Sequence, residues 1–217
     1  MIFRDRRDAG AQLARRLLEF KTEDVLVLGV PRGGVVVAAQ VAKALDAPLD
    51  VVISRKIGAP HNEELAIGAV AADGTVILDD TLVAYLGVSD AYIKSEVDRQ
   101  RKEIQRRLLQ YRGRLPAPVL AGRTILVVDD GVATGMTVRA ALRSLSLKDA
   151  KKVVLGLPVA PPDTVVDLAR EASQIITLYT PEPFYAVGQW YSVFDQTSDE
   201  EVISILKSHT PKAARGQ

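Results

Sequence analysis

The chain has 217 residues, 47% of them hydrophobic and 25% charged, with a formal net charge of +1. This length and composition are typical of one globular domain with a sizeable core, and the small net charge favours neither nucleic acid nor a membrane surface. The absence of cysteine excludes disulfides and thiolate metal sites. The charged N-terminus lacks a signal-type apolar core and no apolar run could span a bilayer, so we expect a cytoplasmic protein.

The first strand–loop–helix junction is rich in glycine. A helix capped by Asp8 should precede it, followed by a strand at residues 25–28 and a helix at residues 35–45. The loop between these two elements, residues 29–34, contains three glycines and Arg32. Glycine allows unusual dihedral angles, free loop N–H groups can bind an anion, and arginine adds a positive charge. The alternative is a plain turn with a surface arginine.

A basic loop follows the next predicted strand, residues 49–53. Arg55 and Lys56 come directly after it, at the carboxyl end of the strand, where ligands collect in open α/β sheets. We therefore predict that both side chains bind an anion, although a solvated Lys56 would explain the sequence equally well. His61 is interpreted as a turn residue.

A hairpin and a long helix occupy the middle of the chain. Residues 65–71 and 75–78 should pair around Asp73 and Gly74, a strong turn signal, and Ser89 should cap the helix. One face of this helix is basic, and we interpret it as solvated; a lid over an anionic ligand and an RNA-contacting face are the alternatives. Its cations are Arg99, Arg101, Lys102, Arg106, Arg107, Arg112 and Arg114.

The most informative stretch is residues 125–137. Four apolar residues predict a strand buried on both faces, Asp129 and Asp130 stand at its end, and a small-residue loop leads into a helix that reaches about residue 147. The helix N-terminus, Gly135 and the hydroxyls of Thr134 and Thr137 suit a phosphate. The two carboxylates would repel that phosphate unless the ligand also presents hydroxyls or a metal ion. A sugar phosphate with a free diol, bound together with Mg²⁺, satisfies every part.

This stretch resembles the ribose 5-phosphate signature of type I phosphoribosyltransferases, which use phosphoribosyl pyrophosphate (PRPP). The resemblance implies that Asp129 and Asp130 hold the ribose hydroxyls. It implies that Arg32 and Lys56 stabilise the leaving pyrophosphate, often beside an unusual cis peptide, which Pro31 would make inexpensive at the Val30–Pro31 bond. The implied substrate-binding residues are Gly33, Gly34, Arg55, Gly131, Val132, Ala133, Thr134, Gly135, Met136 and Thr137.

Two other interpretations compete for the same stretch. Response-regulator receiver domains also begin with a strand that ends in two aspartates, but they need a phosphoacceptor aspartate after a later strand. The later strands predicted here end at Leu157 and Tyr179, without an aspartate. The second alternative is an ordinary acidic turn after a core strand.

The C-terminal third should contain strands at residues 153–157 and 174–179, a helix between them, and a last helix at residues 199–206. Residues 181–191 are irregular and aromatic. In the resembled family this end of the chain usually helps to build a hood over the acceptor, so Trp190 is a candidate substrate-binding residue. An aromatic cluster that packs a loop against the core is the alternative. We predict one domain over residues 1–207 and a flexible tail at residues 208–217.

These elements predict an α/β fold with a mainly parallel sheet flanked by helices, like that of type I phosphoribosyltransferases, with a flap and a small hood. The implied activity moves ribose 5-phosphate from PRPP to an unidentified nitrogen acceptor, which could be a nucleobase, and releases pyrophosphate. Mg²⁺ would be held mainly through PRPP, with no protein metal ligand. Ala133 stands where enzymes for 6-oxopurines carry an acid, which disfavours hypoxanthine and guanine as acceptors.

The expected partners are PRPP and a small-molecule acceptor. We expect no membrane association, nucleic acid is not favoured, and the sequence is compatible with a homodimer. The alternative function is a non-catalytic regulator that senses PRPP or a nucleotide and could bind RNA. The basic helix is the feature that would support it.

Overall fold

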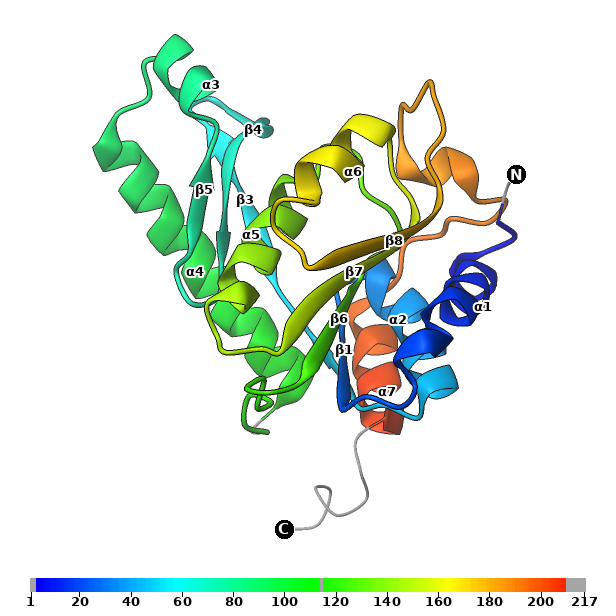
Figure 1. Cartoon of the computed structure of the whole chain (residues 1–217). Helices are drawn as coiled ribbons and strands as arrows, with labels where there is room; N and C mark the ends of the chain where they lie inside the picture. The colour runs from blue at the N-terminus through cyan, green and yellow to red at the C-terminus, as the bar shows by residue number, and fades with distance from the viewer. Residues whose placement is uncertain (1–2, 114, 210–217) are drawn as a thin grey trace.

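Five parallel strands form the main sheet, in the order β2-β1-β6-β7-β8 (Figure 1). The computed structural model describes residues 3–113 and 115–209. Strand β6 pairs with β1 on the side opposite β2, so the crevice between β1 and β6 is a topological switch point, where open α/β sheets bind ligands. The strands are β1 (Val25–Gly29), β2 (Leu49–Val51), β6 (Thr124–Val128), β7 (Lys152–Val159) and β8 (Gln174–Tyr179).

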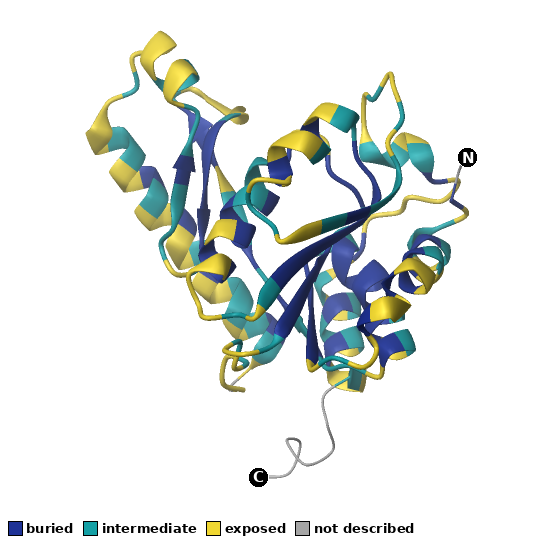
Figure 2. Ribbon diagram, viewed as in Figure 1, coloured by how far each residue is buried: buried dark blue, intermediate teal, exposed yellow. Residues whose placement is uncertain are grey.

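Helices cover both faces of this sheet, because successive residues of the central strands point to opposite sides. Val25 and Val27 of β1 belong to the core cluster that includes α1, α2 and α7, whereas Leu26 and Leu28 belong to the cluster that includes α5 and α6. Figure 2 shows the central strands as the buried layer between these helices. The helices are α1 (Arg6–Leu17), α2 (Gly33–Leu45), α5 (Met136–Ser146), α6 (Pro162–Leu168) and α7 (Asp199–His209), and the short 3-10 helix η1 (Leu18–Phe20) follows α1.

A second, antiparallel sheet forms the flap, which we define as β3 (Ser54–Ala59), β4 (Asn62–Ala71) and β5 (Val76–Leu78). The predicted hairpin is present, and Gly74 takes the positive φ of 96° that its turn requires. The sequence did not predict β3, and the strand expected at residues 49–53 ends at Val51 because the chain leaves the main sheet there to pair with β4. His61 lies in the tight β3–β4 turn, as predicted, with a φ of 64°.

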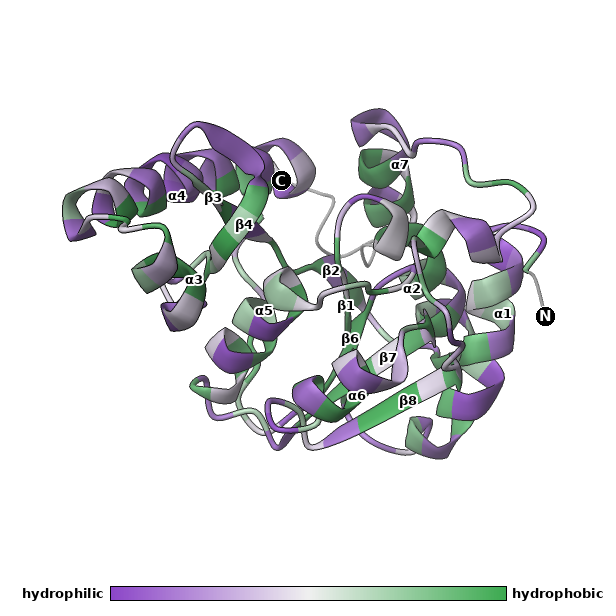
Figure 3. Cartoon of the chain, turned by 90° about the horizontal axis from the view of Figure 1, so that it is seen from above, coloured by the Kyte–Doolittle hydropathy of each residue, from purple (hydrophilic) through white to green (hydrophobic). Residues whose placement is uncertain are grey.

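The long helix α4 (Asp90–Arg112) packs on β3 and β4, after the short helix α3 (Asp80–Tyr85). Ser89 caps α4 as predicted, because its hydroxyl accepts the backbone N–H of Tyr92. Seen from above, α4 and the flap lie on one side of β1 and β6, and α1 and α7 lie on the other side (Figure 3). None of the helices in the described ranges is long and apolar enough to cross a membrane.

Both ends of the described chain differ from the prediction. Asp5, rather than Asp8, caps α1: its carboxylate accepts the N–H of Asp8 at 2.8 Å, so the helix begins at Arg6. Helix α7 continues to His209 and includes the first two residues of the predicted tail; residues 210–217 lie outside the described residues.

Between β8 and α7 lies the hood segment, which we define as residues 181–198 and which contains the 3-10 helix η2 (Val187–Trp190). It packs beside the N-terminal residues, as Figure 1 shows. The ring of Phe3 lies between those of Tyr179 and Tyr191, with centroid distances of 5.5 and 5.3 Å. The start of the chain therefore anchors the hood to the end of the main sheet.

Candidate functional site

The two glycine-containing loops predicted from sequence meet at the carboxyl ends of β1 and β6. The backbone N–H of Val30 donates to the carbonyl of Val128 at 2.9 Å. A Cβ atom on Gly34 would lie 2.6 Å from Oδ1 of Asp129, and one on Gly33 would lie 2.0 Å from Oδ2 of Asp130. Side chains at these two positions would collide with the acidic pair, so glycine is what lets the first loop pack against it.

The carboxylates of Asp129 and Asp130 lie close enough to influence each other, and Arg6 is paired with one of them. The backbone N–H of Asp130 donates to the Asp129 carboxylate at 2.8 Å. Burial, and then the neighbouring Asp130 charge, raise the pKa of Asp129 well above its ordinary value. Asp130 instead accepts a hydrogen bond from Nε of Arg6 at 2.6 Å. The sequence offered no signal for Arg6, which is 124 positions away in the chain.

The loop after β6 combines buried and exposed residues. Gly131 and Val132 are buried, and Met136 packs against a small cluster under the flap, so these residues can offer a ligand only backbone groups or limited contact. Ala133 and Thr134 are exposed. Gly135, with a φ of 73°, is the N-cap of α5, which places the positive end of that helix at the loop. A helix N-terminus of this kind suits a phosphate, and phosphate binding by this loop stays a prediction.

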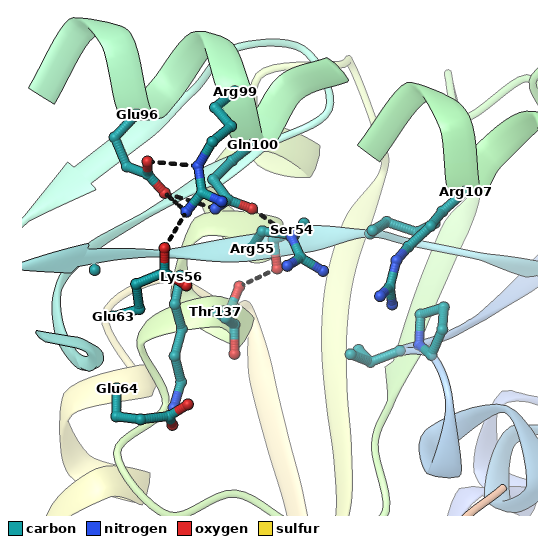
Figure 4. Close-up of a pocket in the computed structure, with 14 residues that line it drawn as sticks. Ser54, Arg55, Lys56, Glu63, Glu64, Glu96, Arg99, Gln100, Arg107 and Thr137 are labelled. Atoms are coloured by element: carbon teal, nitrogen blue, oxygen red, sulfur yellow. Dashed lines mark hydrogen bonds and ion pairs between the residues drawn. The ribbon is translucent and has the colours of Figure 1, made fainter. Parts of the chain in front are cut away.

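A basic pocket lies between the flap, α4 and the first loop (Figure 4). Arg55 and Lys56 come from β3, Arg107 comes from α4, and Pro31 and Thr137 complete the wall toward the two loops. Arg99 also lines the pocket, and so do three carboxylates, Glu63, Glu64 and Glu96, of which Glu63 and Glu96 pair with Arg99. The charges of Arg55, Lys56 and Arg107, beside a helix N-terminus and a glycine-rich loop, attract a polyanion. The sequence favoured a solvated basic face for Arg107, with a lid over an anionic ligand as one alternative, so its place in this pocket is a finding of the tertiary structure.

Arg55 is held firmly in this pocket. Its Nε donates to the side-chain carbonyl of Gln100, whose amide in turn donates to Glu96 at 2.6 Å. Burial, followed by the nearby charge of Arg107, lowers the pKa of the Arg55 guanidinium from its ordinary value. The guanidinium groups of Arg55 and Arg107 repel each other when no ligand is bound. An anion that binds between them is attracted by both and offsets this repulsion.

A family model described as "Phosphoribosyl transferase domain" matches residues 5–178 of the chain. The chain belongs to the phosphoribosyl transferase domain family. This match and the observed sheet confirm the predicted type I phosphoribosyltransferase-like α/β fold, with a flap and a small hood.

Similar proteins agree with this assignment. Two curated proteins from two strains of Mycobacterium tuberculosis, each named "Putative phosphoribosyl transferase", are 46% identical to the chain over 217 residues. The match covers 99% of this chain and 49% of theirs, so the chain spans about half the length of the curated relatives it matches. The crystal structure of TT1426 from Thermus thermophilus is 42% identical, covers 97% of this chain and 100% of its own, and superposes with a TM-score of 0.83.

Arg32 takes a different direction from the other predicted cations. It precedes α2, and its guanidinium lies 3.9 Å from Asp199 at the start of α7 rather than among the residues that line the basic pocket. An unusual cis peptide is present in this phosphoribosyl transferase loop, but it is the Pro31–Arg32 bond and not the expected Val30–Pro31 bond. A proline lowers the free-energy cost of a cis peptide only at the bond that precedes it. The expectation built on Pro31 was therefore one bond too early in the chain.

Trp190 lies in the hood segment, where the family resemblance placed it. Its ring stacks on Phe184 at a centroid distance of 6.1 Å, and the side chain is partly buried. Among the described residues its indole Nε1 has no hydrogen-bond partner. The neighbouring Tyr191 donates its hydroxyl to the carbonyl of Asp130, so the hood is joined directly to the acidic pair.

Most of the basic face of α4 is neutralised locally. Arg99 pairs with Glu96 at 2.7 Å, and Arg106 and Arg107 share Glu103 at 2.7 and 2.8 Å. Hydrogen bonds from these two arginines lower the pKa of Glu103 to about 2. The helix thus displays mixed charge rather than the continuous cationic stripe that would attract nucleic acid. Arg112 pairs with Asp50, and Arg114 lies outside the described residues.

Proposed function

We propose that this domain transfers ribose 5-phosphate from PRPP to a nitrogen acceptor and releases pyrophosphate. The observation that carries the proposal is the meeting of two unlike sites at one switch point. The acidic pair and the N-terminus of α5 stand on one side, and the basic pocket stands on the other. A ligand with a diol, a phosphate and a pyrophosphate has groups that match each of these parts in chemistry.

The proposed roles follow from charge and position. Asp129 and Asp130 accept hydrogen bonds from the ribose hydroxyls, and the backbone from Ala133 to Thr137 binds the 5-phosphate. Arg55, Lys56 and Arg107 stabilise pyrophosphate as it departs with the bonding electron pair, while the acceptor nitrogen forms the new bond to C1. Catalysis then depends on positioning and electrostatic stabilisation, since no protein nucleophile is needed.

The proposed cofactor is Mg²⁺. Carboxylate oxygen is the ligand type that this ion prefers, and Asp129 and Asp130 offer it. One oxygen of Asp130 is engaged by Arg6, however, so the protein can supply few ligands and the phosphate and ribose oxygens of PRPP would complete the shell. When bound, the ion neutralises part of the pyrophosphate charge.

The acceptor is proposed to be a nitrogen base or amine that enters beneath the hood segment. Ala133, which is exposed at the loop, provides no carboxylate for N7 of a 6-oxopurine, so adenine-type bases and non-purine amines are the first candidates. The aromatic rings of Phe184 and Trp190 offer a flat surface on which a base could stack.

The test is pyrophosphate release from PRPP and Mg²⁺ over a panel of bases, amines and water. The control is a variant that combines Asp129→Asn and Asp130→Asn, which keeps side-chain volume while removing the charge-assisted bonds. We expect release with at least one acceptor, and a loss of PRPP binding in the variant with an unchanged circular dichroism spectrum. PRPP binding without release from any acceptor would favour a sensing regulator; no PRPP binding at all would refute both functions.

A further inference from the structure

Arg6 of α1 lies against the site and has no assigned role in it. Its Nε donates to Oδ2 of Asp130 at 2.6 Å, and the side chains of the two residues are only 12% and 15% exposed. Surface ion pairs contribute little and leave a protein unchanged when they are lost, but a pair this enclosed restricts the position of both groups. Of the residues in α1, Arg6 is the one that pairs with the acidic motif after β6.

The carboxylates of Asp129 and Asp130 need such a partner. Two adjacent carboxylates in an enclosed site resist being ionised together, because each disfavours the charge of the other. A nearby guanidinium offsets one of the two charges and stays protonated itself. Arg6 is placed to do this for Asp130, because its Nε lies 2.6 Å from Oδ2 of that carboxylate.

Three further contacts hold the Arg6 guanidinium in place. Its Nη1 donates to the carbonyl of Asp195 at 2.7 Å, and its Cζ lies 3.9 Å from the centre of the Phe194 ring. Gly33 is also close, since a Cβ atom there would lie 2.5 Å from Nε of Arg6. The hood segment, α1 and the first loop therefore all converge on this one group.

The engagement leaves Asp130 able to bind a ligand. A carboxylate offers about four acceptor positions over its two oxygens, and Arg6 uses one of them. The hydroxyl of Tyr191 binds the backbone carbonyl of Asp130 and not its carboxylate, which further limits the motion of the residue without occupying the side chain.

We propose that Arg6 is a positioning residue for the sugar: it supplies the counter-charge of Asp130 and fixes the direction of this carboxylate so that it can bind the diol of ribose 5-phosphate. The inference rests on the proposed function, since it names a further residue of the same site. Loss of Arg6 should affect the sugar end of the ligand and not the pyrophosphate end. Arg6 contacts the acidic pair and is not among the residues that line the basic pocket.

The experiment measures binding of ribose 5-phosphate, pyrophosphate and PRPP separately, by calorimetry with Mg²⁺, to four proteins: wild type, Arg6→Gln, Arg6→Lys and Arg7→Gln. Arg7 is the matched control, since it is the next residue of α1, is 69% exposed, and makes only a 3.8 Å pair with Glu201. Arg6→Gln should weaken ribose 5-phosphate and PRPP by about tenfold or more and leave pyrophosphate unchanged. Arg6→Lys should recover most of the affinity, and Arg7→Gln should match wild type.

Several outcomes would overturn the inference. Wild-type affinity for ribose 5-phosphate in Arg6→Gln would show that the contact is not needed, and a higher affinity would show that Arg6 competes with the sugar. Equal losses for ribose 5-phosphate and pyrophosphate would indicate a merely structural role. If Arg6→Gln does not fold, Arg6→Lys decides alone: a large selective loss of ribose 5-phosphate binding would overturn the importance of the charge. If wild type binds neither PRPP nor ribose 5-phosphate, the proposed function itself fails.

Discussion

The substitution Gly33→Ala should lower the affinity for PRPP while it changes the stability of the fold only slightly. Gly33 is the first residue of α2, and its φ lies outside the left-handed region, so an alanine fits the backbone. Its new methyl group, however, would lie 2.0 Å from Oδ2 of Asp130 and 2.5 Å from Nε of Arg6. The substitution therefore pushes directly on the ion pair between these two side chains.

The size of the effect follows from these distances. Ordinary contact begins at 3.4 Å, so the carboxylate oxygen must retreat by about 1.4 Å, which is enough to break its 2.6 Å bond to Arg6. A hydrogen bond between charged groups is worth on the order of 1.5–3 kcal/mol, which corresponds to about a 10- to 150-fold loss of PRPP affinity if the ligand depends on that geometry. Crowding costs about 1–3 kcal/mol of stability, but replacing glycine by alanine in a helix returns about 1 kcal/mol.

The assay compares PRPP affinity by calorimetry with the midpoint of thermal unfolding. Gly156→Ala is the matched control, because its Cβ atom would lie 3.4 Å from Leu13 and Leu17, an ordinary contact, inside the same sheet. We expect Gly33→Ala to lose affinity with a small change in midpoint and the control to change neither by much. Wild-type PRPP affinity in Gly33→Ala would refute the argument that the Arg6–Asp130 geometry shapes the sugar site.

Three further predictions test other parts of the molecule. Arg107→Gln should weaken pyrophosphate binding by about tenfold, whereas Arg106→Gln should not, since both arginines bind Glu103 but only Arg107 lines the basic pocket; equal effects in calorimetry would contradict the assignment. Trp190→Phe should raise the KM for the acceptor with a loss of stability near 1 kcal/mol or less, because the side chain is only partly buried; a large drop in melting temperature with normal KM would indicate a core role instead. Hydrogen bonds from Lys152 and Thr124 lower the pKa of Glu23 from 4.5 to about 2, so its stabilisation is present above pH 4.5 and is lost as the pH falls toward 2. Urea unfolding of Glu23→Gln should accordingly show a shallower acid loss than wild type over that range, and an identical slope would argue against this role of Glu23.

The sequence by itself determined the local features of this protein. The runs at residues 25–28 and 125–128 are apolar throughout, and such runs favour strands that are buried on both faces, with helices on each side of a parallel sheet. The glycines and aspartates after these strands are also local signals, because turns and helix N-termini are encoded by neighbouring residues. Both loops could therefore be recognised, and the family assigned, before any contact between them was known.

Only the tertiary structure decided which distant groups meet. Strand β3 has little alternation of its own and exists because β4 and α4 cover it, so no short-range pattern could reveal it. Arg107 differs from its neighbour Arg106 only in the direction that the packing of α4 against the flap gives it. Arg6 reaches Asp130 because α1 lies at the end of the sheet next to the hood. Charge pairing between residues over a hundred positions apart has no periodicity or spacing to mark it; it arises from the way that separate layers pack against each other.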